Sequence, residues 1–210
     1  MLPLSPSAPR FAYVLAHGAG AGMRHPFLEA MAQALLERDT ATLRYEFKYM
    51  EEHRNRPDPP AVAAERVREA VERARAEWPA LPLVAGGKSF GGRMTSTAQA
   101  EQPLDGVRGL VFLGFPLHPP GKPSVTRAEH LFQVEVPMLF LQGTRDEFAQ
   151  LDLLTGVCEK LGPRATLHLI EDGDHSFKVP KRSGRTADQV MAHLADTIAD
   201  WGTRLAGQPK

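Results

Sequence analysis

Six short apolar runs, separated by longer amphipathic stretches, restrict the fold more than any other feature of this chain. They cover residues 11–16, 42–47, 83–86, 110–114, 138–142 and 166–170. Most are nearly continuous in apolar residues, as is typical of strands that are covered on both faces. Between them apolar residues recur at helical spacing, for example Val190, Leu194 and Ile198. The alternation predicts an α/β chain with about six mostly parallel strands and helices on both faces of the sheet.

The length of the chain fits one medium-sized domain with a substantial core, at 210 residues. Two proline-rich segments, residues 57–60 and 119–123, interrupt the pattern but are too short to separate domains. We therefore expect one α/β domain over residues 1–210.

Charge and cysteine content argue against several classes of protein. Lys+Arg and Asp+Glu both number 25, whereas a nucleic-acid-binding protein usually has a basic excess. The single cysteine, Cys158, allows neither an internal disulfide nor a cysteine-based zinc site, and is consistent with a reducing compartment. The start has no apolar run of signal-peptide length, and no run could span a bilayer. We expect a cytoplasmic protein with neither a nucleic-acid nor a membrane partner.

The segment after the third apolar run carries the most chemical information. Gly87, Ser89 and Gly91 form a G-x-S-x-G pattern between a predicted strand and a predicted helix. A nucleophile on such a sharp turn has strained backbone angles, and small neighbours relieve the crowding. The helix that follows directs its N-terminal amides at the reaction centre. The pattern therefore predicts Ser89 as a nucleophile, against the alternative of a glycine-rich turn with an ordinary surface serine.

Two nucleotide-binding interpretations of the glycines fail at specific positions. Residues 87–89 resemble the end of a phosphate-binding loop, but that motif needs a glycine where the chain has Pro82. A dinucleotide-binding pattern that starts at Gly18 would need a glycine where the chain has Met23. We therefore expect no organic cofactor, and nothing in the sequence implies a metal.

A serine nucleophile needs a base, and the base needs an acid to orient it. Further along the chain from such a turn, the acid comes directly after one strand, and the histidine comes directly after a later strand. Asp146 follows the run at 138–142, and His175 follows the run at 166–170. We predict that Ser89, Asp146 and His175 form a catalytic triad.

Alternatives in the same loops stay open. Glu147 could replace its neighbour as the acid, and Asp172 or Asp174 could cap backbone near the histidine. An acidic residue after a strand is most often a cap, and a loop histidine most often lies on the surface.

The first apolar run ends in a histidine and a series of small residues, at residues 17–22. Its position matches the loop that supplies half of an oxyanion hole, and small residues let backbone amides approach closely. The backbone N–H groups of Ala19 and Phe90 are the predicted donors. We expect His17 to organise this loop.

The interval between Gly114 and Pro137 is too short for a substantial cap domain. We therefore expect an open, shallow site suited to short acyl groups, with residues 115–123 as one wall. Lys88, His118 and Lys122 are candidate substrate contacts. Further cations gather in the sequence near the predicted site and would either form a solvated face or select anionic substrates: Arg93, Arg145, Lys178, Lys181, Arg182 and Arg185.

Five blocks together resemble one branch of the α/β-hydrolases: residues 15–20, 86–93, 114–123, 142–146 and 172–177. That branch is similar to dienelactone hydrolases and includes a testis-expressed hydrolase-like protein and a subunit of the non-specific lethal chromatin complex. The resemblance implies an α/β-hydrolase fold and places the triad on Ser89, Asp146 and His175. Dienelactone hydrolases carry cysteine where this chain has Ser89, so their substrate is not implied.

We therefore expect a serine hydrolase of carboxylesterase or thioesterase type, acting on a small-molecule acyl substrate through an acyl-serine intermediate. The alternative is a catalytically silent scaffold that acts as a protein-binding module, which the chromatin-associated relative suggests.

Overall fold

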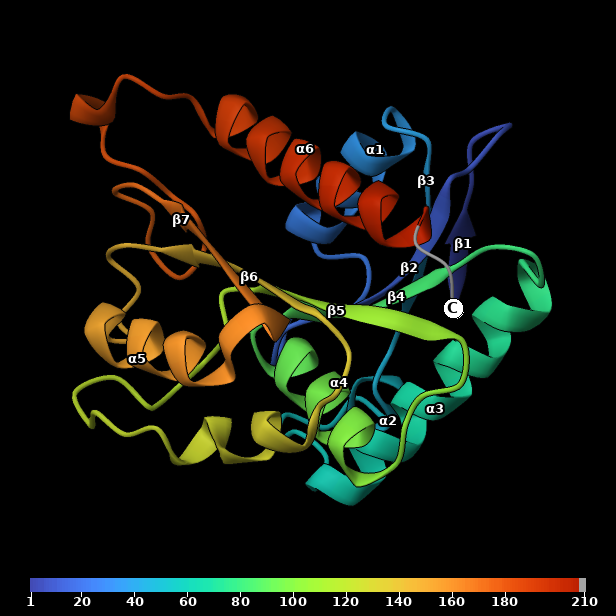
Figure 1. Cartoon of the computed structure of the whole chain (residues 1–210), viewed down its shortest axis with the longest axis horizontal. Coiled ribbons are helices and arrows are strands. Elements are labelled where there is room, and N and C mark those ends of the chain that lie inside the picture. The colour runs from blue at the N-terminus through green and yellow to red at the C-terminus, as the bar shows by residue number, and fades with distance from the viewer. Residues whose placement is uncertain (208–210) are drawn as a thin grey trace.

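The computed structural model describes residues 1–207, in which seven strands form one sheet (Figure 1). The strand order is β1-β3-β2-β4-β5-β6-β7. Strands β2 to β7 run parallel to their neighbours, while β1 pairs antiparallel with β3. The strands are β1 (Leu2–Leu4), β2 (Phe11–Ala16), β3 (Thr40–Tyr45), β4 (Leu83–Lys88), β5 (Val107–Leu113), β6 (Met138–Gly143) and β7 (Ala165–Ile170).

The six predicted runs correspond to β2–β7, with boundaries that differ by up to three residues. The sheet has one further strand, β1, which has no apolar run of its own. This strand is three residues long, contains Pro3 and has a single neighbour, β3. Proline is compatible with an edge strand, since one side of the strand makes no ladder bonds.

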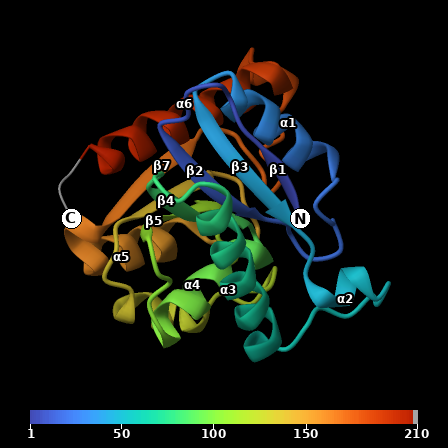
Figure 2. The same ribbon diagram turned by 90° about the vertical axis from the view of Figure 1, so that its right-hand side faces the viewer.

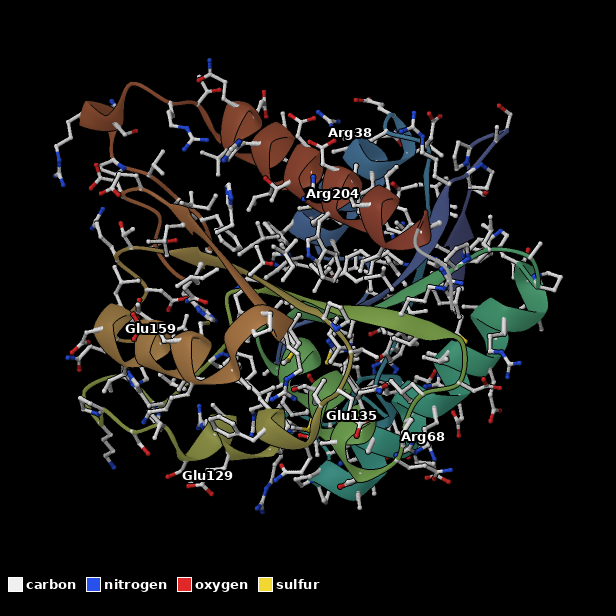
Figure 3. The ribbon with its side chains drawn as sticks, in the orientation of Figure 1. Arg38, Arg68, Glu129, Glu135, Glu159 and Arg204 are labelled. Atoms are coloured by element: carbon white, nitrogen blue, oxygen red, sulfur yellow. The ribbon has the colours of Figure 1, made fainter. Side chains whose placement is uncertain are left out.

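Helices cover both faces of the sheet, as the alternation predicts (Figures 1 and 2). Helices α1 and α6 pack together on one face, and α3, α4 and α5 lie on the other. Figure 3 shows the labelled Glu129 and Glu159, both exposed, on the outer side of this second layer. The helices are α1 (Pro26–Leu36), α2 (Lys48–Glu51), α3 (Pro60–Glu77), α4 (Phe90–Glu101), α5 (Leu151–Leu161) and α6 (Ala187–Ala206), with 3₁₀ turns η1 (Thr126–Gln133), η2 (Gly162–Arg164) and η3 (Lys181–Ser183).

The core forms two buried clusters, one on each face of the sheet. On the α1 and α6 face, the apolar stripe predicted for α6 is buried, including Val190, Leu194 and Ile198. Helix α6 begins with a capping box, in which Thr186 and Gln189 satisfy each other's backbone N–H groups. Burial of these side chains provides most of the force that holds the helix on the sheet.

The strand order reverses between β2 and β4, and this reversal determines where a ligand fits. In open α/β sheets, ligands bind beyond the carboxyl ends of the strands at such a switch point. Between β5 and β6 the structure has loops and the 3₁₀ turn η1 but no cap domain. None of the helices in residues 1–207 is both long and apolar enough to cross a membrane.

Candidate active site

Ser89 lies at the carboxyl end of β4, on the turn that leads into α4. Its φ of 48° and ψ of −113° are sparsely populated for a residue with a side chain. Its N–H donates to the Leu113 carbonyl at 3.1 Å, and its own carbonyl accepts from Arg93 N–H at 3.1 Å. The turn is therefore held by β5 on one side and by the first turn of α4 on the other.

The two glycines that flank Ser89 are required by contact with β2. A Cβ on Gly87 would stand 2.2 Å from the Ala16 carbonyl oxygen, and one on Gly91 would stand 2.5 Å from the His17 carbonyl oxygen. No side chain fits at these distances. The G-x-S-x-G spacing thus lets the turn lie directly against the end of the neighbouring strand.

Ser89, His175 and Asp146 form a continuous chain of hydrogen bonds. The Ser89 Oγ lies 2.9 Å from His175 Nε2, and His175 Nδ1 lies 2.7 Å from Asp146 Oδ2. The Asp146 side chain is fully buried, whereas 19% of the His175 side chain is exposed. The alternative acid, Glu147, is exposed. An imidazole held between a buried carboxylate and a hydroxyl can accept the hydroxyl proton.

Two further residues hold the carboxylate, and the sequence analysis missed both. The buried side-chain amide of Gln142 donates to Asp146 Oδ2 at 2.6 Å, and the Phe148 N–H donates to Asp146 Oδ1 at 2.8 Å. The Phe148 ring also packs against the His175 imidazole, with ring centroids 4.3 Å apart. A glutamine directly before a glycine is an ordinary strand end, so only the structure identifies the role of Gln142.

The loops after β6 and β7 are joined, which sets the position of Asp146 relative to His175. A Cβ on Gly143 would stand 2.2 Å from the Gly173 carbonyl oxygen, so the two loops meet at backbone distance. The Asp172 N–H also donates to Thr144 Oγ1 at 2.9 Å.

Asp174 caps the segment after the histidine, as the sequence analysis allowed. Its Oδ1 accepts from the Ser176 and Lys178 N–H groups, at 2.8 and 2.9 Å. The backbone on both sides of His175 is thereby fixed.

The loop after β2 is braced by a buried histidine and a tyrosine. His17 Nδ1 lies 2.8 Å from the Gly18 carbonyl, and the Phe47 N–H donates to His17 Nε2 at 3.1 Å. Burial lowers the pKa of His17, which favours the neutral ring that this pairing needs. The Gly20 N–H donates to the Tyr49 hydroxyl at 2.9 Å. His17 therefore organises this loop, as expected.

The two amides predicted for an oxyanion hole belong to these fixed elements. Ala19 lies in the braced loop and lines the same cavity as Ser89. Phe90 is the first residue of α4, where a backbone N–H has no acceptor within the helix. Their role as oxyanion donors stays a prediction.

A cavity of about 930 Å³ opens beside Ser89 and His175. Its walls come from the loop after β2, the start of α1, the loop after β7 and the first half of α6. Most of the side chains from the two helices are apolar: Phe27, Leu28, Val190, Met191 and Leu194. Phe27 stacks on Phe177 with ring centroids 6.0 Å apart, which joins α1 to the loop after β7. These core helices thus build one wall of the cavity without a cap domain, whereas the expected wall at residues 115–123 was wrong, because none of these residues lines the cavity. That the site is open and shallow stays a prediction.

Two of the candidate substrate contacts lie outside this cavity. The buried His118 is occupied by backbone, since its Nδ1 lies 2.9 Å from the Pro119 carbonyl and the Gln150 N–H donates to its Nε2 at 2.9 Å. Lys122 is exposed and does not line the cavity. His118 instead joins the loop after β5 to the start of α5.

The cations that seemed adjacent in sequence separate in space. Lys178 and Arg185 line the cavity, whereas Lys181 and Arg182 do not. Arg182 pairs with Asp172 at 3.1 Å. Arg145 is exposed and does not line the cavity. Arg93 lies on α4, where burial, and in second place the charge of Arg127, lowers its pKa.

Lys88 lines the cavity and also reaches behind the histidine. Its Nζ donates to the His175 backbone carbonyl at 2.6 Å. Burial lowers the pKa of Lys88 to about 8, against the attraction of Asp146 and Asp174.

Within residues 1–207, no three or more His, Cys, Asp or Glu side chains are grouped so as to hold a metal ion.

Solved structures with the same fold come from several bacteria. An alpha-beta serine hydrolase homologue from Coxiella burnetii is 17% identical, with a TM-score of 0.74 over 95% of this chain and 89% of that one. A serine hydrolase without a lid from Xanthomonas campestris is 20% identical, with a TM-score of 0.72 over 96% and 86%. A dienelactone hydrolase from Anabaena variabilis is 20% identical, with a TM-score of 0.73 over 96% and 89%. At these identities the likeness concerns the fold.

The sequence itself matches a family model over nearly its whole length. The model describes an alpha/beta hydrolase domain, and the match covers residues 9–203. This span includes the turn at Ser89, the buried Asp146 and the loop that carries His175. The chain belongs to the alpha/beta hydrolase domain family.

Proposed function

We propose that the protein is a serine hydrolase that cleaves an ester, thioester or similar acyl bond through an acyl-Ser89 intermediate. The observation that carries the proposal is the hydrogen-bonded chain from Ser89 through His175 to the buried Asp146. Carboxylesterases and thioesterases are the types that this arrangement fits best. The partner is then a small-molecule acyl substrate.

The reaction follows from the positions of these groups. His175 Nε2 takes the Ser89 proton as Oγ attacks the acyl carbon, and the backbone amides of Ala19 and Phe90 stabilise the oxyanion. The imidazolium then gives its proton to the leaving group, which departs and leaves an ester on Ser89. Water attacks this ester with His175 again as the base, and the acid product and free Ser89 result. Asp146 keeps the imidazole in the tautomer that accepts at Nε2.

The acyl group is placed in the cavity, against the apolar side chains of α1 and α6. Burial of apolar surface favours a hydrocarbon chain there, by about 0.8 kcal/mol for each CH₂ group. The finer resemblance, to the branch with the testis-expressed protein and the chromatin-complex subunit, is part of this proposal. So is a cytoplasmic location, which rests on cysteine usage. We do not favour the silent scaffold, because a binding module has no need for an imidazole between Ser89 and Asp146.

Labelling with a fluorophosphonate probe tests the function. Wild-type protein is expected to be labelled at Ser89, and Ser89→Ala to lose both labelling and ester hydrolysis. Ser176→Ala is the matched control, because Ser176 lines the same cavity, and within residues 1–207 its hydroxyl makes no hydrogen bond to a histidine. Labelling at another serine, together with full activity of Ser89→Ala, would refute the proposal.

A further inference from the structure

We infer that Lys88 is a positioning residue, which ties the loop of the base to the turn of the nucleophile. This inference rests on the proposed function and assigns a task to the variable residue of the G-x-S-x-G pattern.

The hydrogen bond of Lys88 links the neighbour of the nucleophile to the base itself. Lys88 directly precedes Ser89, and its Nζ donates to the backbone carbonyl of His175 itself at 2.6 Å. A bond from a charged donor is about twice as strong as a neutral one. The Lys88 side chain therefore spans from the end of β4 to the loop after β7, and it fixes the separation of Ser89 and His175.

The end of β5 is shaped to admit this contact. Gly114 has a φ of +70°, and a Cβ there would stand 3.1 Å from Lys88 Nζ and 3.4 Å from His175 Nδ1. Both nitrogens thus approach the same point of bare backbone, which a side chain at this position would crowd. The Phe177 ring covers the ammonium from another side, with its centroid 5.6 Å from Nζ.

The ammonium is charged at neutral pH and lies among identifiable charges. Its pKa of about 8 leaves it mostly protonated at pH 7. The carboxylates that act on it are Asp146, from the loop after β6, and Asp174, from the loop of the base. Lys178 and Arg185 are further cations of the cavity lining.

The role of Lys88 is therefore geometric. Without this bond the loop after β7 loses its link to the turn that carries Ser89, and the imidazole is held less exactly against the Ser89 Oγ.

The test measures kcat, KM and the rate of fluorophosphonate labelling of Lys88→Met at pH 7, where the ammonium is mostly protonated. We expect kcat and the labelling rate to fall about tenfold, because His175 is misplaced against Ser89, and the loss to lie in kcat and not in KM. Lys181→Met removes an exposed cation of the same loop and should leave both rates unchanged.

Rescue separates a missing ammonium from a damaged fold. In Lys88→Cys, alkylation with 2-bromoethylamine rebuilds an amine at nearly the original length and should return kcat and the labelling rate toward their wild-type values. The chain has one native cysteine, Cys158, and burial raises the pKa of its thiol to about 11, so the new cysteine reacts selectively. Circular dichroism checks that each variant is folded.

The outcomes keep the two proposals distinct. Unchanged kcat and labelling rate in Lys88→Met, or no recovery in the alkylated cysteine variant, would overturn the role of Lys88 while Ser89 labelling stands. Loss of the proposed function would instead appear in the wild-type protein, as an absence of labelling at Ser89.

Discussion

Gln142 donates to the same oxygen of Asp146 that lies 2.7 Å from His175 Nδ1. The glutamine is fixed in turn, because its Oε1 accepts the Phe115 N–H at 2.8 Å. Its two ends thus connect the loop after β5 to the carboxylate. We expect Gln142→Leu to lower kcat about tenfold, since Asp146 loses one of the bonds that orient it. It should also lower the free energy of unfolding by about 1–3 kcal/mol, because the buried Phe115 N–H loses its acceptor. Kinetics and urea unfolding measure the two effects, and unchanged kcat would contradict the assignment.

The identity of the acid is tested by two amide substitutions. Asp146→Asn should keep the fold but lower kcat by roughly 10³–10⁴, because an amide supports the wrong tautomer of the imidazole. Glu147→Gln is the matched control, since Glu147 is exposed, and it should have little effect. Steady-state kinetics decide, and a damaging Glu147→Gln beside a harmless Asp146→Asn would mean that the acid is misassigned.

The apolar lining of the cavity predicts how the rate of hydrolysis depends on the length of the acyl chain. Met191 lines the cavity from α6, and its neighbour Ala192 does not. We expect Met191→Trp to slow the hydrolysis of p-nitrophenyl esters with long acyl chains while the acetate ester is nearly unaffected. Ala192→Trp should leave the ratio of rates unchanged. Equal losses across the ester series would place the acyl group elsewhere.

The cations that line the cavity predict a preference for anionic substrates. Fewer residues contribute to it than the sequence suggested, because Lys181 and Arg182 lie outside the lining. Arg185 and Lys178 line the cavity, and neither has an ion-pair partner within residues 1–207. We expect Arg185→Gln to reduce kcat/KM for an anionic ester relative to a neutral isostere, most strongly at low salt. Arg182→Gln is the control, because this residue lies outside the lining. A charged and a neutral ester with equal kcat/KM in wild type at low salt would exclude the preference.

A half-buried histidine away from the site, His130, predicts acid sensitivity of the fold. His130 Nε2 lies 2.7 Å from Ser96 Oγ, and burial, followed by repulsion from Arg93, lowers the pKa of His130 to about 4. Between its ordinary pKa of 6.5 and this value the unfolded chain binds the proton and the folded chain does not. Stability is therefore lost as pH falls through this window, by about 1–2 kcal/mol at pH 5. In His130→Gln this loss should be absent, which urea unfolding at pH 7.5 and pH 5 would measure. An equal loss in both proteins would assign the sensitivity to other groups.

The strands and the positions of Ser89, Asp146 and His175 could be predicted because each leaves a local signal. Apolar runs mark parallel strands, and residues that follow such runs meet at one edge of the sheet. Strand β1 left no signal, because three half-exposed residues have no periodicity.

The supports of the site were less accessible, because they depend on contacts between distant segments. Gln142 joins the loops after two strands, β5 and β6, and Lys88 reaches a carbonyl 87 residues away. The cavity wall was missed for a related reason. The residues of α6 were interpreted as core, and Val190 and Leu194 are indeed buried, but the same side chains also face the cavity.

That double use of α6 restricts how such a protein can change its specificity. A hydrolase with a separate cap can replace the cap and leave the sheet untouched. Here Val190 and Leu194 belong at once to the hydrophobic core and to the wall beside Ser89. A substitution that reshapes the wall also removes or adds core volume, and a buried Leu→Ala change costs about 2–5 kcal/mol. Selection for a new acyl group is therefore expected to encounter loss of stability first, so that evolution or engineering of this site would need a stabilised starting sequence.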